Sequence, residues 1–118
     1  MPVLFVYGVP DKDVGLLEEF TSNIISTVAN NVEELNLSEA DVSCFFPKDK
    51  LQKRLGEEII IFVDGLFEKP ERTEEVRNRL ASEIVETAHE FYPEVNLIEC
   101  FIRPFNPAQG FKAFKKQK

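Results

Sequence analysis

The chain has 118 residues, of which 43% are hydrophobic and 30% are charged, and its formal net charge is −7. This length fits one domain, residues 1–118, that can bury a core without metal or disulfide cross-links. The negative charge argues against a nucleic-acid partner. No apolar run approaches the roughly 20 residues that span a bilayer, and the N-terminus lacks the pattern of a signal peptide. We therefore expect a cytoplasmic protein with no membrane partner.

The first half of the chain predicts a strand, a helix and a second strand. Residues 2–7 and 41–46 are rich in β-branched and aromatic side chains, which favour strands. Between them, apolar residues recur at steps of three and four over about residues 13–34, a spacing that predicts an amphipathic helix. The apolar stripe of this helix consists of Leu17, Phe20, Ile24, Val28 and Val32.

The second half predicts the same three elements again. Strands are expected over residues 58–63 and 95–103, for the same compositional reason. The helix between them should begin after Thr73, a good N-cap residue, and end before Pro93. Its apolar stripe consists of Val76, Leu80, Ile84, Ala88 and Phe91. The predicted order is therefore β-α-β-β-α-β.

This order also reads as an internal repeat. Residues 3–8 resemble residues 60–65, and both segments end in glycine. Residues 43–47 parallel residues 99–104, since both contain a Cys-Phe pair followed by a proline. Chance similarity between apolar strands is the alternative explanation. The matching glycine, Cys-Phe and helix positions favour two duplicated β-α-β units, over about residues 2–47 and 58–104, and an α+β fold.

The predicted first and third strands bear on assembly. Residues 3–6 and 59–63 are apolar at every position, without the alternation expected of a sheet that is wetted on one face. Two crossover helices can cover only one face of a four-stranded sheet. We therefore expect another subunit to cover the second face.

Common catalytic and metal-binding signatures are absent from the sequence. It contains no phosphate-binding glycine loop, no HExxH, no CxxC pair and no G-x-S-x-G. Cys44 and Cys100 occupy equivalent strand positions and are expected to be small buried hydrophobes rather than a disulfide or a metal pair. His89 lies beside the second apolar stripe and is expected on the helix surface. We therefore predict no metal and no cofactor.

Pro2, the two β-α-β units and the expected oligomer together resemble the tautomerase superfamily, whose members begin with a catalytic proline exposed by methionine removal. The likeness is carried by residues 1–6, 42–47 and 106–111. It is strongest to the branches of macrophage migration inhibitory factor and 5-carboxymethyl-2-hydroxymuconate isomerase, which have two such units per chain and form trimers. The resemblance implies a four-stranded mixed sheet with two helices on one face, a homotrimer and tautomerase or isomerase activity.

The resemblance also implies that Pro2 is a general base. An α-amino group has a reference pKa of about 7.7 to 8.0, which burial and nearby cations lower further. The substrate would be a small keto-enol compound or an unsaturated carboxylate. The nitrogen can act only once Met1 is removed, because it is otherwise part of a tertiary amide. The alternative is that proline is simply tolerated at the first residue of a strand.

An enolate and a substrate carboxylate would need cationic or N–H partners. The candidate substrate-binding residues are Lys48, Lys50, Arg54, Asp64 and Arg103. Lys48 and Arg103 are preferred, because both follow the repeated Cys-Phe strands and should occupy pseudo-equivalent ends. Each of these residues is alternatively an ordinary surface charge.

Two further functional readings remain open from the residues. The chain could be a non-catalytic trimer on the same fold that binds a small ligand or a protein. The order β-α-β-β-α-β is also that of ferredoxin-like regulatory modules, which bind small ligands. Ferredoxin-like sheets are antiparallel, so the direction of the strands distinguishes the two folds.

Overall fold

The computed structural model describes residues 1–10, 13–48 and 58–116. Within these residues the elements are β1 (Val3–Tyr7), α1 (Val14–Asn30), β2 (Ser43–Phe45), β3 (Glu58–Phe67), α2 (Glu74–Phe91) and β4 (Leu97–Phe105). Two short 3-10 helices, η1 (Glu33–Leu35) and η2 (Glu39–Asp41), connect α1 to β2. The predicted order of strands and helices is confirmed.

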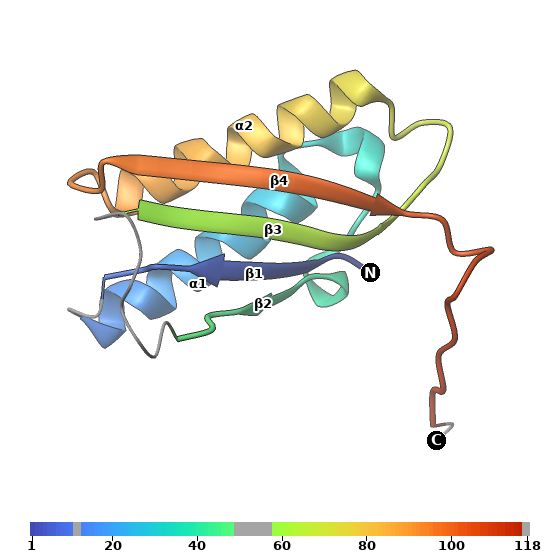
Figure 1. Ribbon diagram of the computed structural model, residues 1–118, viewed down its shortest axis with the longest axis horizontal. Coiled ribbons are helices and arrows are strands. Elements are labelled where there is room, and N and C mark those ends of the chain that lie inside the picture. Colours follow the sequence, from blue (N-terminus) through green and yellow to red (C-terminus); the bar gives the residue numbers. More distant parts are fainter. Residues whose placement is uncertain (11–12, 49–57, 117–118) are drawn as a thin grey trace.

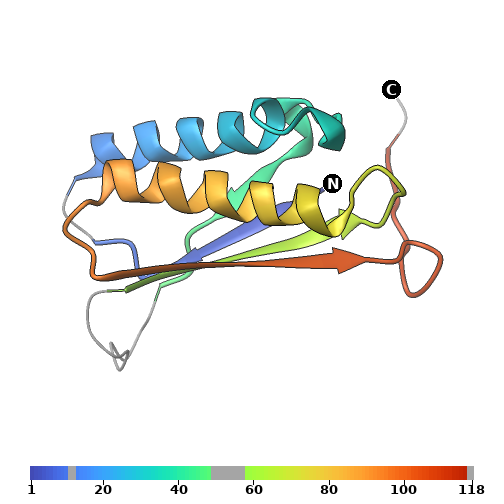
Figure 2. The ribbon, with the colours of Figure 1, turned by 90° about the horizontal axis from the view of Figure 1, so that it is seen from above.

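The strands form one sheet in the order β2-β1-β3-β4. The pairs β1–β2 and β3–β4 are parallel, whereas the central pair β1–β3 is antiparallel. Both helices lie on the same face of this sheet (Figures 1 and 2). The predicted α+β fold, with two β-α-β units in a mixed sheet and two helices on one face, is confirmed. The parallel outer pairs are inconsistent with a ferredoxin-like antiparallel sheet.

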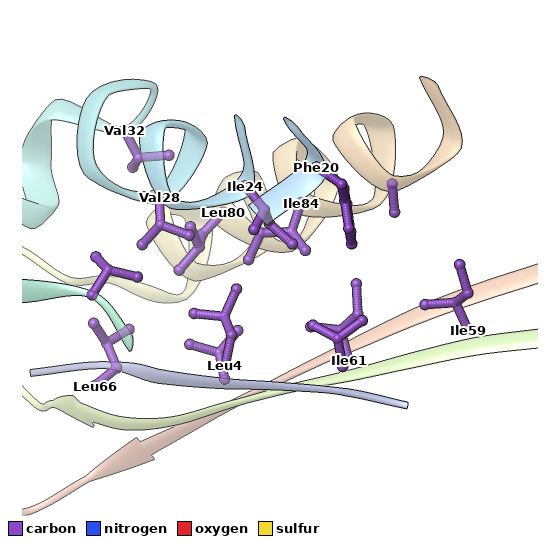
Figure 3. Packing of buried hydrophobic residues seen from close by; sticks show 14 of the residues in the cluster. Leu4, Phe20, Ile24, Val28, Val32, Ile59, Ile61, Leu66, Leu80 and Ile84 are labelled. Atoms are coloured by element: carbon purple, nitrogen blue, oxygen red, sulfur yellow. The ribbon is translucent and has the colours of Figure 1, made fainter. Parts of the chain in front are cut away.

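The core lies between the helices and the covered face of the sheet. Leu4 and Val6 of β1 alternate with outward-facing residues, and both are buried against the helices. Phe20 of α1 is fully buried, and its ring packs edge-on against Tyr92 with ring centroids 5.2 Å apart. Figure 3 shows the two helices and the strands contributing side chains to one cluster. Full burial of each such side chain contributes about 1.5–3 kcal/mol, so both predicted helical stripes hold the fold together.

The N-terminal ends of both helices are capped by side chains. Asp13 accepts a hydrogen bond from the Leu16 N–H at 3.2 Å, at the start of α1. Thr73 accepts one from the Val76 N–H at 3.2 Å, which confirms the predicted cap of α2. Each cap satisfies a backbone donor that has no partner within the helix.

The region after α1 differs from the prediction. The helix ends at Asn30 instead of about residue 34, and Asn36 adopts a left-handed conformation with φ of 52°. Asparagine tolerates this conformation better than most residues. Residues 39–41 form η2, capped reciprocally by Ser38 and Asp41, so the second strand is shorter than predicted. Val32 is nevertheless fully buried, as its place in the stripe predicts.

The third strand is longer than predicted and extends to Phe67. Gly65 has φ of 73°, and the register between β3 and β4 shifts between Asp64 and Leu66. Such a bulge inserts one residue without ending the strand. Because of it, Leu66 returns to the buried side of the sheet. The fourth strand lies at residues 97–105, two residues later than predicted at each end.

The two cysteines, predicted to be small buried hydrophobes, lie on the covered side of the sheet and are partly buried. Cys44 and Cys100 are free thiols that pack against the core. Burial raises the pKa of each thiol to about 12. His89 is exposed in the last turn of α2, as predicted. In the part of the chain that the structure describes, neither helix has the length and apolar character needed to cross a membrane.

Candidate functional site

Pro2 lies directly before β1, at the end of the sheet where the chain starts. Its side chain is buried. Its carbonyl oxygen accepts a hydrogen bond from the Ser43 N–H at 3.2 Å, which ties the start of β1 to β2. The chain start is therefore held within the fold rather than extending from it.

The bulge in β3 passes close to this chain start. A Cβ atom placed on Gly65 would lie 3.1 Å from the carbonyl oxygen of Met1, and the positive φ of Gly65 also disfavours a side chain. Only glycine combines this backbone conformation with this close approach. The β3 bulge thus forms one wall beside the N-terminus.

The terminal amine, which belongs to Met1 in this structure, has a pKa below its ordinary value. Partial burial is the largest cause, and the positive charge of Arg72 is the second. Lys69 lowers the pKa as well, whereas the carboxylate of Asp41 opposes the change. This end of the sheet therefore favours a neutral amine.

Arg72 is the functional candidate that the sequence reasoning missed. It lies in the turn between β3 and α2, and only 6% of its surface is exposed. Its Nη1 donates to the carbonyl of Phe67 at 2.8 Å, and its Nη2 donates to the carbonyl of Leu35 at 2.9 Å. In the sequence, Arg72 belongs to a run of charged residues that is typical of a solvated surface. No sequence signal therefore distinguishes it from its exposed neighbours. Its burial depends on Leu35, which is distant along the chain.

Two of the predicted site residues, Asp64 and Arg103, lie next to each other at the Pro2 end of the sheet. They face each other across β3 and β4, and Asp64 is also the register partner of Val3. Arg103 donates through Nε and Nη2 to the two carboxylate oxygens of Asp64, at 2.5 and 2.6 Å. The hydrogen bond to Asp64 raises the pKa of Arg103. The guanidinium also lies over the ring of Phe62, 4.3 Å from its centroid.

Lys48 lies away from this end. It follows β2, which runs parallel to β1, so the chain leaves β2 at the end of the sheet opposite to the N-terminus (Figure 1). The side chain of Lys48 is exposed. Lys50 and Arg54 lie outside the described residues.

A row of phenylalanines crosses the face of the sheet that the helices leave uncovered. Phe45, Phe5, Phe62 and Phe101 are consecutive register partners across the four strands. The rings of Phe5 and Phe45 stack with centroids 5.9 Å apart, and those of Phe62 and Phe101 with centroids 5.4 Å apart. Phe45 and Phe101 are 53% and 46% exposed. A single chain thus leaves an aromatic surface open, where the sequence predicts another subunit.

A separate groove of about 440 Å³ lies between α2 and the edge strand β4. Its lining includes Arg77, Asn78, Ala81 and Phe101, and it shares Arg103 with the ion pair but does not include Pro2. Among the residues that the structure describes, no group of three His, Cys, Asp or Glu side chains is arranged to hold a metal ion.

Known structures share this fold at low sequence identity. No family model matches the sequence, and no curated protein is significantly similar to it. One solved structure, a symmetric trimer of wild-type fused 4-OT, superposes with a TM-score of 0.70 at 16% identity over 93% of both chains. Macrophage migration inhibitory factor from Toxoplasma gondii gives 0.69 at 12% identity, over 96% of this chain and 97% of that one.

A third solved structure belongs to malonate semialdehyde decarboxylase. It superposes with a TM-score of 0.67 at 9% identity, over 98% of this chain and 92% of that one. Each of the three comparisons covers at least 93% of this chain. The chain therefore has the fold of the tautomerase superfamily.

Proposed function

We propose that the chain is a tautomerase or isomerase in which Pro2, freed by removal of Met1, acts as a general base. The observation that carries the proposal is the environment of the terminal amine. The amine of Met1 is partly buried, and its pKa is lowered by that burial and by the positive charge of Arg72, which is itself buried. Removal of Met1 makes the Pro2 nitrogen the terminal amine of the same strand. A base that is neutral near working pH is the most effective proton acceptor.

The proposed reaction is a proton shift on a small keto-enol compound or an unsaturated carboxylate. The Pro2 nitrogen takes a proton from a carbon next to a carbonyl, and the electron pair of the C–H bond moves toward the carbonyl oxygen. The protonated Pro2 then returns the proton to another atom of the conjugated system. The nitrogen is regenerated, and the reaction consumes no co-reactant.

The negative charge that develops on the substrate needs positive partners. Arg103 is a candidate for this role because it lies at the same end of the sheet as Pro2, with Asp64 holding its guanidinium. Lys48 lies at the opposite end of its own sheet, so it could reach Pro2 only from a neighbouring copy. Lys50 and Arg54 remain predictions.

We propose that the assembly is a homotrimer in which the aromatic face meets neighbouring copies. The row of four phenylalanines supports this proposal, because exposed apolar patches of this extent mark association surfaces. Two of the similar solved structures are described as symmetric trimers of fused 4-OT. Sedimentation of the purified chain would measure the assembly directly.

The proposed activity is tested on Met1-free protein with enol dicarboxylates and aryl keto acids as substrates. Pro2→Ala should lower kcat/KM by about 100-fold or more, the usual contribution of a general base. Pro93→Ala is the matched control, since Pro93 is exposed beyond the end of α2. Turnover that is unaffected by Pro2→Ala would remove Pro2 from the mechanism. If the mass of the untagged protein shows that Met1 is retained, the non-catalytic binding module becomes the better description.

A further inference from the structure

Arg72 is a buried cation, and its hydrogen bonds do not pair its positive charge with an anion. Its guanidinium donates to two backbone carbonyls, those of Phe67 and Leu35, and no acidic side chain among the described residues accepts from it. Its Nε is buried with no hydrogen-bond partner in the same part of the chain. A buried charge without a paired anion costs free energy, and an apolar side chain of similar volume is often no less stable at such a position. Packing alone is therefore a poor reason for an arginine here.

The two carbonyls belong to two segments that are distant along the chain, and one of them lies beside the chain start. Phe67 is the last residue of β3, just beyond the bulge that lies beside Met1, and Leu35 is the last residue of η1. Hydrogen bonds from one guanidinium to both carbonyls hold these two segments at a fixed separation. The planar fork of arginine suits this task, because it offers several donors in a rigid arrangement.

The backbone of Arg72 is held as firmly as its side chain. Its N–H donates to the carbonyl of Lys69 at 2.9 Å, and its own carbonyl accepts from Nη1 of Arg77 at 2.7 Å. The next residue, Thr73, caps α2. The guanidinium therefore has little freedom to move toward a substrate, and its charge stays in one place.

We propose that Arg72 is the positioning residue of the N-terminal site: it ties the end of η1 to the end of β3, whose bulge lies beside Met1, and it fixes a positive charge at this end of the sheet that acts on the Pro2 amine. The inference rests on the proposed function only in naming that amine as the base.

Other charged groups act on the amine more weakly or in the opposite sense. Lys69 also lowers its pKa, but its side chain is exposed, so water and salt screen its charge. Asp41 raises the pKa of the amine, and its carboxylate is engaged by the N–H and hydroxyl of Ser38. Glu71 acts on Arg72 itself, where it counters the effect of burial on the guanidinium. Arg72 is thus the buried charge among these groups.

The test is a titration of the Pro2 amine in Met1-free protein, followed by NMR of isotope-labelled proline nitrogen. The other prolines are amides and do not titrate. Two neutral variants, Arg72→Met and Arg72→Gln, should move the midpoint to higher pH and lower the neutral fraction about three- to tenfold on the acidic side of the midpoint. Arg72→Lys keeps the charge and should titrate close to wild type. Arg79→Met removes an exposed arginine from α2 and is the control for overall charge.

The outcomes separate a charge effect from a structural one. An unchanged midpoint in a folded neutral variant would overturn the proposal, as would an equal change in Arg72→Lys and Arg72→Met. If neither neutral variant folds while Arg72→Lys does, the role in holding the segments is supported. In that case the charge role of Arg72 is overturned if the amine of the wild-type protein titrates at the same pH in the folded and the unfolded chain.

This readout does not require turnover, so it is independent of the proposed activity. A midpoint that depends on Arg72, together with turnover unaffected by Pro2→Ala, would reject Pro2 as the base and keep the role of Arg72. A midpoint that is independent of Arg72, together with loss of turnover in Pro2→Ala, would do the reverse.

Discussion

The covered and uncovered faces of the sheet carry different kinds of apolar side chain. Beneath the helices, β1 and β3 present aliphatic residues such as Leu4 and Ile61, which are fully buried. On the other face the same strands present aromatic residues such as Phe5 and Phe62, which are half-buried. Aliphatic side chains fill a closed core, whereas large flat rings can stack on one another before a partner arrives. The difference shows which face folding closes and which face assembly would close.

The largest effect is expected when a Phe→Ala substitution in the core under the helices is compared with one on the open face of the sheet. Phe20→Ala should lower the free energy of unfolding by about 3–5 kcal/mol, because it empties a fully buried site that contacts Phe46, Phe91 and Tyr92. Phe45→Ala on the open face should cost about 1 kcal/mol or less in monomeric protein, since the ring is 53% exposed. Urea unfolding at low protein concentration measures both values. Equal losses would contradict the distinction between the faces.

The next effect tests whether the covered face is closed to solvent. Burial raises the pKa of Cys44 and Cys100 from 9.0 to about 12, so the thiolate fraction near neutral pH falls roughly a thousandfold. Both thiols should react with a disulfide reagent at least that much more slowly in the native protein than in urea. Their reactivity should rise only as the pH approaches the raised pKa. Fast labelling of either thiol in folded protein would mean that this face opens.

The open face is tested by a charge placed within the aromatic row. Phe101→Glu should raise the dissociation constant of the assembly at least about tenfold, because the carboxylate would have to be desolvated in the contact. The isolated chain should keep its fold, since Phe101 is 46% exposed. Sedimentation at several concentrations measures the change. Val14→Glu, at an exposed residue of α1, is the control, and equal behaviour of the two variants would exclude this face as the contact.

The smallest effect concerns an ion pair that belongs to neither face. Arg79 on α2 donates two hydrogen bonds to the carboxylate of Glu34 on η1, and these are the largest cause of the lowering of the Glu34 pKa from 4.5 to about 2. A lowered carboxyl pKa stabilises the fold above the unfolded-state value, and this stabilisation is lost as the pH falls toward 2. Arg79→Met should therefore lower the urea midpoint slightly at about pH 6, and the difference from wild type should vanish near pH 2. A difference that persists at low pH would assign the effect to lost packing.

The periodic elements could be predicted from the sequence, because their pattern and their burial have the same physical cause. Leu80 and Ile84 lie in the core where the helical spacing places them, and Thr73 caps the helix as its side chain allows. The position of the functional groups depends on strand direction, which no local pattern encodes. The ends after the two Cys-Phe strands are equivalent in the repeat, yet the antiparallel β1–β3 pair puts Lys48 and Arg103 at opposite ends of the sheet.

Arg72 was beyond sequence reasoning for a related reason. Nothing within the turn that contains it indicates burial, since its neighbours Lys69 and Glu71 are exposed charges. The guanidinium donates to backbone carbonyls, and every type of residue has a backbone carbonyl. A contact between a side chain and a distant backbone atom leaves no trace in residue types.

The bulge at Gly65 divides β3 into two stretches of opposite phase. Before it, odd-numbered residues such as Val63 point under the helices, and after it an even-numbered residue, Leu66, does so. If Gly65 were paired regularly with β4 and the bulge were lost, Leu66 would turn to the open face and Phe67 would turn inward. The strand would then present the wrong carbonyl to Arg72. An insertion between Gly65 and Phe67 would therefore keep the Phe67 carbonyl directed at Arg72 only if it adds an even number of residues.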